Sequence, residues 1–301
     1  MKIFKYLIGL LLIMFIFFSC AKKPISKETK YGELIYANLE NASFPHPDRE
    51  KGYTYKNEFY SYKGHFDDNM VAILIPKNYS PSKNIDFVVH FHGWNNSVDS
   101  VLEQYELLEQ FSKSKKNAIF VVPQGPKNVS DSFGGKLSDK GGFNRFMKEL
   151  MSLLKDRKDI PEDSKIHDIV LTGHSGGYKV IADIISKNSI FKHIHEIYLF
   201  DALYGEIKTY LDWLNVAGRR FFVIYTDSGG TKKKTKELVN IYKGVGFPYY
   251  YQHTKKVKKW ELIKNPIMVL HSDLGHNEVM YKRKMFQRIL KNSRLKGIKT
   301  K

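Results

Sequence analysis

Strand-like and helix-like patterns alternate through most of this 301-residue chain, and this alternation limits its possible folds more than any other feature. Apolar runs rich in β-branched and aromatic residues predict strands, and apolar residues at helical spacing predict helices between them. The expected strands are 53–62, 70–75, 85–91, 118–122, 169–171, 197–200, 221–225 and 267–270, and the expected helices are 98–111, 143–154, 177–186, 207–214, 234–242 and 279–290. Because parallel strands need crossover connections, this order predicts one α/β domain with a mostly parallel central sheet flanked by helices. A hydrophobic content of 42% is enough for a substantial core.

The amino terminus has the pattern of a secretory signal. Lys2 and Lys5 precede an apolar run from Tyr6 to Phe18, which is shorter than the roughly 20 residues that span a membrane. The next residues, Ser19 and Cys20, resemble the end of a bacterial lipobox, in which the cysteine is lipidated. We therefore expect residues 1–19 to be a lipoprotein signal peptide and Cys20 to carry a fatty acid such as palmitate. An ordinary signal peptide, or an uncleaved anchor, that happens to end in Cys is the alternative.

The residues after Cys20 are polar and lack apolar periodicity. We expect residues 20–45 to form a flexible tether and residues 46–301 to form the folded domain. This organisation predicts an exported lipoprotein of the bacterial cell membrane or outer membrane. Since Cys20 is the only cysteine, disulfides within the chain and Cys-cluster metal sites are excluded.

Basic residues are in excess: 49 Lys and Arg against 31 Asp and Glu give a formal net charge of +18. The basic runs 232–234 and 255–259 lie near the aromatic run 249–251, a pattern that superficially resembles a nucleic-acid-binding surface. An exported lipoprotein seldom meets nucleic acid, so we expect no nucleic-acid partner and favour anionic lipid or an envelope polymer. A solvated basic face without a specific partner is the alternative.

The motif Gly173-His174-Ser175-Gly176-Gly177 satisfies G-x-S-x-G, with an expected strand before it and an expected helix after it. This context is that of a nucleophile elbow, a tight turn at which bulky neighbours would collide with the backbone. We expect the Ser175 hydroxyl to be exposed above the sheet as a nucleophile. The alternative is a glycine-rich turn with an inert serine.

A serine nucleophile needs a general base, and the base needs a carboxylate that orients it. His276, just past the last expected strand, is our candidate for the base, and His271 at the end of that strand is the rival. For the acid we favour Asp201, which directly ends the strand 197–200. Asp227, after the strand 221–225, is the alternative acid. A structural histidine and a capping aspartate are the alternatives without a catalytic role.

Acyl transfer also requires donors for the oxyanion of the tetrahedral intermediate. The N–H of Gly176, directly after the nucleophile, is one candidate. The sequence His92-Gly93-Trp94 resembles the oxyanion loop of lipases and esterases, so we expect the second donor to be the Trp94 N–H, with Gly93 beside it. His90 and His92 could share a strand face as metal ligands, but no third ligand follows at a compatible spacing. We expect no metal and no cofactor.

A Gly-rich polar stretch separates the oxyanion loop from the elbow, at the strand end where ligands bind in open α/β sheets. Gln124, Asp131 and Lys136, together with His92, are candidate contacts for a substrate. A solvated surface loop is the alternative.

Taken together, residues 50–295 resemble the α/β-hydrolase superfamily, because Ser175, Asp201 or Asp227, and His276 occur in its Ser–acid–His order with the oxyanion loop upstream. The resemblance implies a serine hydrolase, of the carboxylesterase or amidase kind, that forms an acyl-enzyme and needs no cofactor. The substrate would be a small or polymer-borne acyl compound. A non-catalytic envelope-binding lipoprotein on a hydrolase scaffold and an acyltransferase with the same triad are the alternatives.

Overall fold

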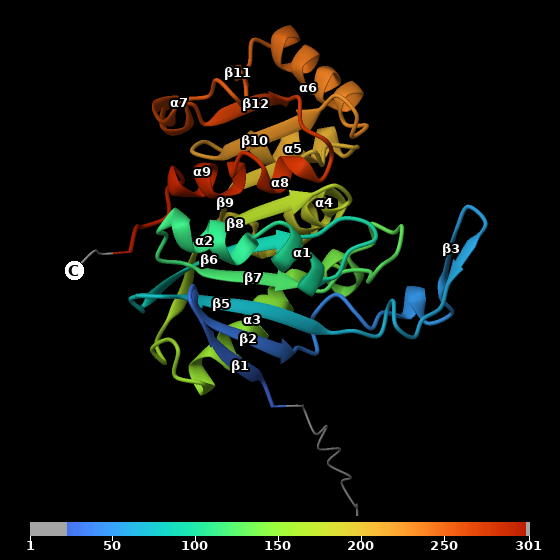
Figure 1. The fold of residues 1–301 in the computed structure, drawn as a ribbon, viewed down its shortest axis with the longest axis vertical. Helices are drawn as coiled ribbons and strands as arrows, with labels where there is room; N and C mark the ends of the chain where they lie inside the picture. The colour runs from blue at the N-terminus through green and yellow to red at the C-terminus, as the bar shows by residue number, and fades with distance from the viewer. Residues whose placement is uncertain (1–22, 299–301) are drawn as a thin grey trace, which may run out of the picture.

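The computed structural model describes residues 23–298, so the expected signal peptide and Cys20 lie outside the described residues. Its central feature is a ten-stranded sheet with the spatial order β1-β2-β5-β7-β6-β8-β9-β10-β12-β11 (Figure 1). In chain order these strands are β1 Ile25–Thr29, β2 Gly32–Asn38, β5 Met70–Pro76, β6 Asn84–Phe91, β7 Ile119–Pro123, β8 Lys165–His174, β9 Ile194–Phe200, β10 Arg220–Thr226, β11 Tyr250–His253 and β12 Ile267–Ser272. All pairs from β7 to β11 in this order are parallel, whereas β1, β2 and β5 are joined antiparallel to their neighbours. The predicted α/β class and mostly parallel sheet are confirmed.

Helices cover both faces of this sheet. They are α1 Val98–Gln104, α2 Leu107–Ser114, α3 Gly142–Asp156, α4 Gly177–Lys187, α5 Ile207–Leu214, α6 Lys232–Gly244, α7 Lys259–Lys264, α8 Glu278–Tyr281 and α9 Met285–Lys291. Helices α3 to α6 contribute to one hydrophobic core, and α1, α2, α7, α8 and α9 contribute to the other. Successive residues of a central strand serve opposite cores: Phe87 and Val89 pack under α3 and α4, and Val88 packs on the other side. Such fully buried strands explain the near-continuous apolar runs in the sequence.

The expected tether differs from the structure. Strands β1 and β2 occupy most of 25–38, and Leu39, Ala42 and Phe44 beyond them are buried. The ordered domain therefore begins by Ile25 instead of residue 46. Strand β1 is an exposed edge strand, so its polar sequence carries no apolar alternation that could have predicted it.

Two expected helices are each broken in two. The region 98–111 is divided between α1 and α2 by Glu106, and the region 279–290 is divided between α8 and α9 by Lys284. Both residues have left-handed backbone conformations, with φ of 52° and 48°. The two breaks meet in space, because the Lys284 ammonium forms an ion pair with the Glu106 carboxylate.

A small hairpin projects from the side of the sheet where the parallel strands end (Figure 1). Its strands are β3 Tyr53–Tyr55 and β4 Glu58–Tyr60, which pair antiparallel with each other only. A separate aromatic cluster that includes Phe44, Tyr60 and Phe66 anchors this region to the domain. None of the helices formed by residues 23–298 is long and apolar enough to cross a membrane.

Candidate active site

Ser175 lies in a sharp turn between the end of β8 and the start of α4. Its φ of 52° is left-handed, an unfavourable conformation for a residue with a side chain. A Cβ atom at Gly177 would lie 2.4 Å from the Phe91 carbonyl oxygen, and one at Gly173 would lie 2.8 Å from Ile181 Cδ1. Both flanking positions therefore need glycine. The strand, the strained serine and the following helix form the geometry of a nucleophile elbow.

His276 and Asp201 lie together next to this turn. His276 Nδ1 is 2.7 Å from Asp201 Oδ2. The carboxylate of Asp201 is inaccessible to solvent and also accepts hydrogen bonds from the Thr226 N–H at 3.1 Å, the Thr226 hydroxyl at 2.7 Å and the Thr231 hydroxyl. Burial opposes ionisation of this group, but the hydrogen bonds from His276, Thr231 and Thr226 bring the pKa of Asp201 below its ordinary value. The site thus contains a buried, ionised carboxylate that orients an imidazole.

The alternative acid and the alternative base pair with each other instead. Asp227 Oδ2 is 3.0 Å from His271 Nε2, and Asp227 Oδ1 is 2.7 Å from the Lys232 ammonium. Hydrogen bonds from Lys232 and His271 lower the pKa of Asp227. Half of the Asp227 side chain is exposed, so this is a surface network. The structure therefore brings His276 to Asp201 and leaves Asp227 with His271.

His174 directly precedes Ser175, and it holds the backbone of His276, the candidate base. Its Nε2–H donates to the carbonyl oxygen of His276 at 2.9 Å, and the two rings lie 4.6 Å apart. Burial lowers the pKa of His174 to about 3, so its ring is neutral. Sequence reasoning missed this role, because the contact joins two loops that lie far apart in the chain.

The expected oxyanion donors lie against the elbow. A Cβ atom at Gly93 would be 2.4 Å from Ser175 Cβ, so the backbone of the loop after β6 passes directly beside the nucleophile. Trp94 follows, and its indole packs on Gly176, where a Cβ atom would be 2.9 Å from Trp94 Cδ1. Within residues 23–298, neither the Gly176 N–H nor the Trp94 N–H donates to a protein acceptor. Two backbone donors beside Ser175 are thus available to a ligand.

The comparison with solved structures shows which fold carries this geometry. A ferulic acid esterase aligns with a TM-score of 0.50 and 12% identity, over 74% of this chain and 90% of that chain. A feruloyl esterase module from Clostridium thermocellum, in complex with sinapinate, aligns with a TM-score of 0.50 and 11% identity, over 90% of this chain and 95% of that chain. The fold is that of the α/β hydrolases. Neither protein-family models nor curated proteins match the sequence.

Two of the expected substrate contacts in this α/β-hydrolase fold are hydrogen-bonded within the protein, and one of them, His92, also lines the pocket described below. His92 is buried: its Nδ1–H donates to the Gly93 carbonyl at 2.8 Å, and its Nε2 accepts from the Gly125 N–H at 3.0 Å. Gln124 is fully buried and bonds to the His92 ring, and its Oε1 accepts from the Val98 N–H at 2.9 Å. Both side chains are therefore occupied in joining the oxyanion loop to the loop after β7. Burial lowers the pKa of His92, in keeping with a neutral ring.

Lys136 also differs from the prediction. Its ammonium donates to the Glu40 carbonyl oxygen at 2.7 Å. This bond fixes the segment after β2 and does not direct the charge toward Ser175.

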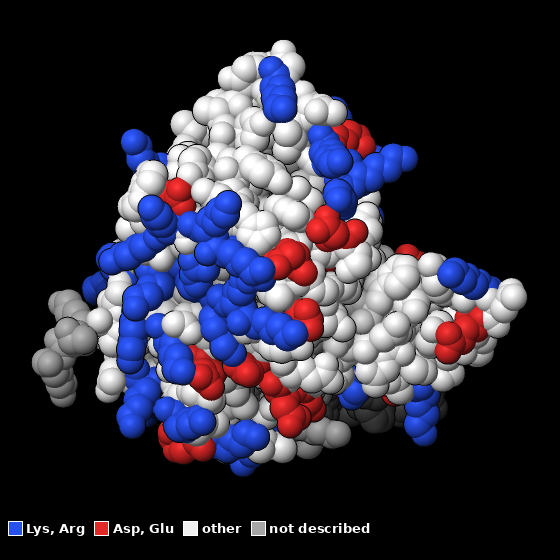
Figure 2. All heavy atoms as spheres, turned by 45° about the horizontal axis from the view of Figure 1, so that its top comes forward, with Lys and Arg blue, Asp and Glu red and all other residues white. Residues whose placement is uncertain are grey.

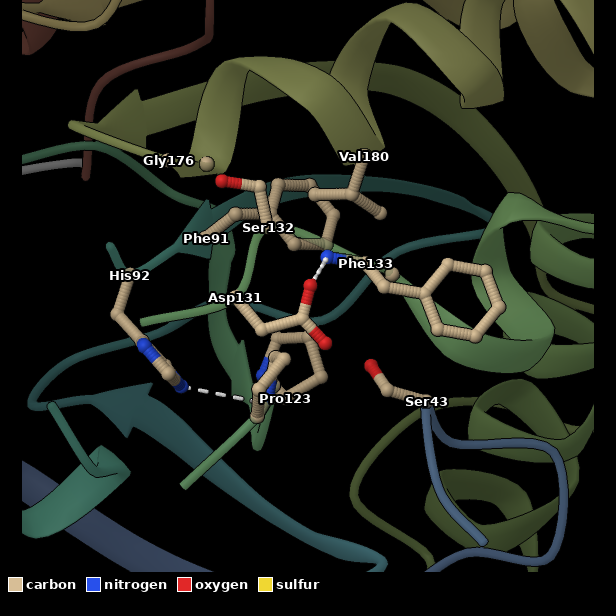
Figure 3. A pocket seen from close by; sticks show the side chains of 13 residues that line it. Ser43, Phe91, His92, Pro123, Asp131, Ser132, Phe133, Gly176 and Val180 are labelled. Carbon is tan, nitrogen blue, oxygen red and sulfur yellow. Dashed lines mark hydrogen bonds between the residues drawn. The ribbon is translucent and has the colours of Figure 1, made fainter. Parts of the chain in front are cut away.

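Asp131 does face a pocket beside the elbow (Figure 3). The pocket is small, with a volume of about 20 Å³, and it is bordered by Gly176 and Gly177 of the elbow. Asp131 Oδ1 accepts from the Phe133 N–H at 3.0 Å, and Asp131 Oδ2 is 2.8 Å from Arg49 Nε. The Arg49 guanidinium lies 4.6 Å from the centre of the Phe133 ring, so this ion pair is packed against an aromatic wall. Arg49 was not predicted, because no local pattern links it to a site.

Tyr204 is a further residue that sequence reasoning missed. Its hydroxyl donates to the Gly229 carbonyl oxygen, and its ring centre is 6.4 Å from that of His276. Burial raises the pKa of Tyr204 to about 12, and a hydrogen bond with the Ser175 side chain opposes that rise. The phenol therefore lies neutral beside the nucleophile. In the sequence, the signal for a place near the site is that Tyr204 follows Asp201 by three positions.

Proposed function

We propose that the chain is a serine hydrolase that cleaves an ester or amide bond through an acyl-enzyme on Ser175. The observation that carries the proposal is the His276–Asp201 pair beside the strained Ser175 turn. A buried carboxylate with four hydrogen-bond donors has a structural role as well, but an imidazole that it holds beside a partly exposed serine serves general base catalysis.

In the proposed acylation step, Ser175 Oγ attacks the substrate carbonyl carbon while His276 Nε2 takes the hydroxyl proton. Asp201 accepts the Nδ1–H and stabilises the imidazolium that forms. The carbonyl oxygen becomes an oxyanion that the N–H groups of Gly176 and Trp94 bind. Collapse of this intermediate breaks the bond to the leaving alcohol or amine, which receives the proton from His276.

The acyl-enzyme is then an ester of Ser175. A water molecule gives a proton to His276 and attacks the ester carbonyl, and the same two N–H groups bind the second oxyanion. Its collapse releases the carboxylic acid and returns the proton to Ser175. The proposed cycle uses only side chains and backbone groups of this chain.

For the substrate, we propose esters as the first class to test. The two similar structures are described as a ferulic acid esterase and as a feruloyl esterase module in complex with sinapinate. Hydroxycinnamate esters and acetate esters differ in the size of the acyl group, so a panel containing both would measure the size of acyl group that the site around Ser175 accepts.

A fluorophosphonate probe tests the proposal, because it labels only a serine that a general base activates. Wild-type protein should be labelled, and Ser175→Ala should lose labelling and about 10³-fold or more of esterase activity. Ser61→Ala, an exposed substitution in the hairpin region, is the matched control and should behave as wild type. Labelling of the Ser175→Ala variant at the wild-type level would exclude Ser175 as the nucleophile.

We also propose that the enzyme works at a bacterial envelope membrane, attached through lipid on Cys20. The support is the sequence pattern of residues 1–20 together with the distribution of charge. Figure 2 shows Lys and Arg gathered on the side of the molecule that bears α2 and α9. A basic face of this kind is suited to anionic lipid or an anionic envelope polymer, and its attraction to either would weaken with salt.

A further inference from the structure

A second group of ionisable side chains lies at the edge of the sheet opposite Ser175. Asp86, His167, Asp168 and His195 belong to the starts of β6, β8 and β9, which are neighbouring parallel strands. At about 3.3 Å per residue, roughly 20 Å of strand separates Asp168 from Ser175. The group is therefore separate from the proposed active site.

Two irregularities in the sheet bring these side chains together. Where β6 pairs with β8, two residues of β8, His167 and Asp168, stand opposite the single residue Asp86. Where β8 pairs with β9, His195 is an extra residue without an opposite partner. In a regular strand, His167 and Asp168 would point to opposite faces, whereas a bulge redirects a side chain. Consecutive bulges on adjacent strands thus collect these side chains from three strands.

The ligating atoms converge closely. His167 Nδ1 is 2.8 Å from Asp86 Oδ1 and 3.5 Å from Asp168 Oδ2. One ligating atom from each of these three residues lies within 4.8 Å of the others. Ligands that bind one tetrahedral ion at about 2.0–2.2 Å lie roughly 3.4 Å from each other, so small shifts of these side chains would admit an ion.

His195 lies beside these three residues and, of them, contacts only the Asp168 carboxylate. Its Nδ1 is 2.7 Å from Asp168 Oδ1, yet this buried atom has no hydrogen-bond partner among the described residues. The two atoms are close, but they are not aligned as donor and acceptor. His195 is therefore placed to position the Asp168 carboxylate from outside the three ligating residues.

In the described part of the chain, the carboxylates of the group have histidines and the Asp168 N–H as partners but no Lys or Arg. The Asp86 side chain is only 5% exposed, and a buried carboxylate is costly unless its charge is compensated. Within residues 23–298, no Lys or Arg forms an ion pair with Asp86 or Asp168, although the chain has a large excess of basic residues.

We propose that Asp86, His167 and Asp168 form a binding site for a divalent transition-metal ion, with His195 positioning the Asp168 carboxylate and with zinc as the preferred ion. Mixed imidazole and carboxylate ligands suit zinc, and two carboxylates balance its charge. The side chains of His167 and His195 are nearly half exposed, which gives the ion access from solvent. At this position the ion would join the starts of β6 and β8. The proposal departs from the metal-free expectation of the sequence, in which the bulges that gather the ligands are not visible.

Zinc titration of the full-length protein in detergent, after removal of metals with EDTA, tests the site. We expect one ion per chain, and calcium or magnesium should not displace it. His167→Ala and His195→Ala should each weaken zinc affinity at least about tenfold. His253→Ala is the matched control, because His253 is close to one carboxylate, Asp273, at 3.4 Å, and it should keep wild-type affinity.

Further variants and a second probe make the result decisive. Because Asp86→Asn alters a buried group that folding needs, Asp168→Asn serves as the carboxylate variant, and it should also weaken zinc binding. Bound cobalt(II) should give visible absorption bands that change in His167→Ala. Ser175→Ala should bind zinc normally, so failure of the proposed hydrolase would not affect this test. Wild-type protein without stoichiometric zinc, or unchanged affinity in both histidine variants, would overturn the proposal and leave only a hydrogen-bonded surface cluster.

Discussion

At the scale of single residues, the candidate site depends on how Asp201 is held. Its backbone is left-handed, with φ of 45°, and a Cβ atom at Gly229 would lie 1.5 Å from its Oδ2. The loop after β10 therefore closes over the carboxylate at a position that only glycine can occupy. Three donors from that loop and one from His276 keep the group ionised despite its burial. The imidazole thus finds a fixed charge in place before any substrate arrives.

The two candidate acids can be separated by paired substitutions. Asp201→Asn should lower kcat/KM by about 10³- to 10⁴-fold, because an amide there cannot stabilise the imidazolium of His276. Asp227→Asn should remain within about threefold of wild type, since Asp227 pairs with His271 at the surface. Steady-state kinetics on one ester substrate measures both. The reverse ranking would assign the acid to Asp227.

His174 makes the stability of the domain depend on pH. Its pKa is lowered to about 3 by burial, whereas the ordinary histidine value is 6.5. Below pH 6.5 the unfolded chain therefore binds a proton that the folded chain does not, and the free energy of unfolding falls as the pH falls toward 3. His174→Gln, which keeps a donor for the His276 carbonyl, should reduce this loss by up to about 1.4 kcal/mol per pH unit. Urea unfolding at pH 7, 6 and 5 would show it, and identical slopes for the two proteins would contradict the assignment.

At the scale of elements, the loop after β6 and the elbow after β8 form one unit. β6 and β8 are parallel neighbours whose carboxyl ends lie side by side, so Gly93 contacts Ser175 directly. His92 and Gln124 attach this unit to the loop after β7. A close approach of two backbones, fixed by buried hydrogen bonds, keeps the Trp94 N–H beside the nucleophile.

This contact predicts a strong effect of a single methyl group. Gly93→Ala would place a Cβ atom 2.4 Å from Ser175 Cβ, so the loop has to move and carry the Trp94 N–H away. We expect kcat/KM to fall by about 10²-fold or more, as when one oxyanion donor is lost. Gly244→Ala, where a Cβ atom meets nothing within 4 Å, is the matched control and should change neither kcat/KM nor Tm appreciably. Full activity of Gly93→Ala would show that the loop is not part of the site.

The sequence predicts the elements of the central sheet well, because buried strands and amphipathic helices leave strong periodic patterns. It does not predict β1 and β2, which fall in the expected tether, the short edge strand β11, or the breaks at Glu106 and Lys284, which lack a glycine signal. The positions of Ser175, Asp201 and His276 at strand ends follow from local patterns. The roles of His174, Arg49 and Tyr204 do not, since they depend on which loops meet after folding.

At the scale of the whole molecule, two features bear on how the domain would associate with a membrane surface: the basic face and the expected lipid anchor. Helices α2 and α9 pack against each other, and cationic side chains gather on their side of the molecule in Figure 2. Some of these cations pair with acids such as Glu106 and Glu109, which reduces the local charge. Membrane attachment through Cys20 is a separate matter and can be tested by itself.

Removal of the cysteine tests the anchor. Cys20→Ala should move the protein from the membrane fraction to the soluble fraction and abolish incorporation of labelled palmitate, because Cys20 is the only cysteine available for lipidation. Activity per folded molecule should stay unchanged. Unaltered palmitate incorporation in Cys20→Ala would show that the lipid is attached elsewhere.

The direction of β1 decides how such an anchor would orient the enzyme. β1 is antiparallel to β2, β2 to β5, and β5 to β7, so Ile25 lies at the carboxyl edge of the parallel strands, the edge that bears Ser175. A lipid on Cys20 would be connected to that edge through the four residues 21–24. Fully extended, this segment places the Cys20 Cα at most about 18 Å from the Ile25 Cα. The edge that bears Ser175 would then lie on the side of the molecule where the anchor attaches, with Ser175 itself five strands away from β1. Substrates carried at the membrane would be within reach, and those farther away would have to diffuse to this edge.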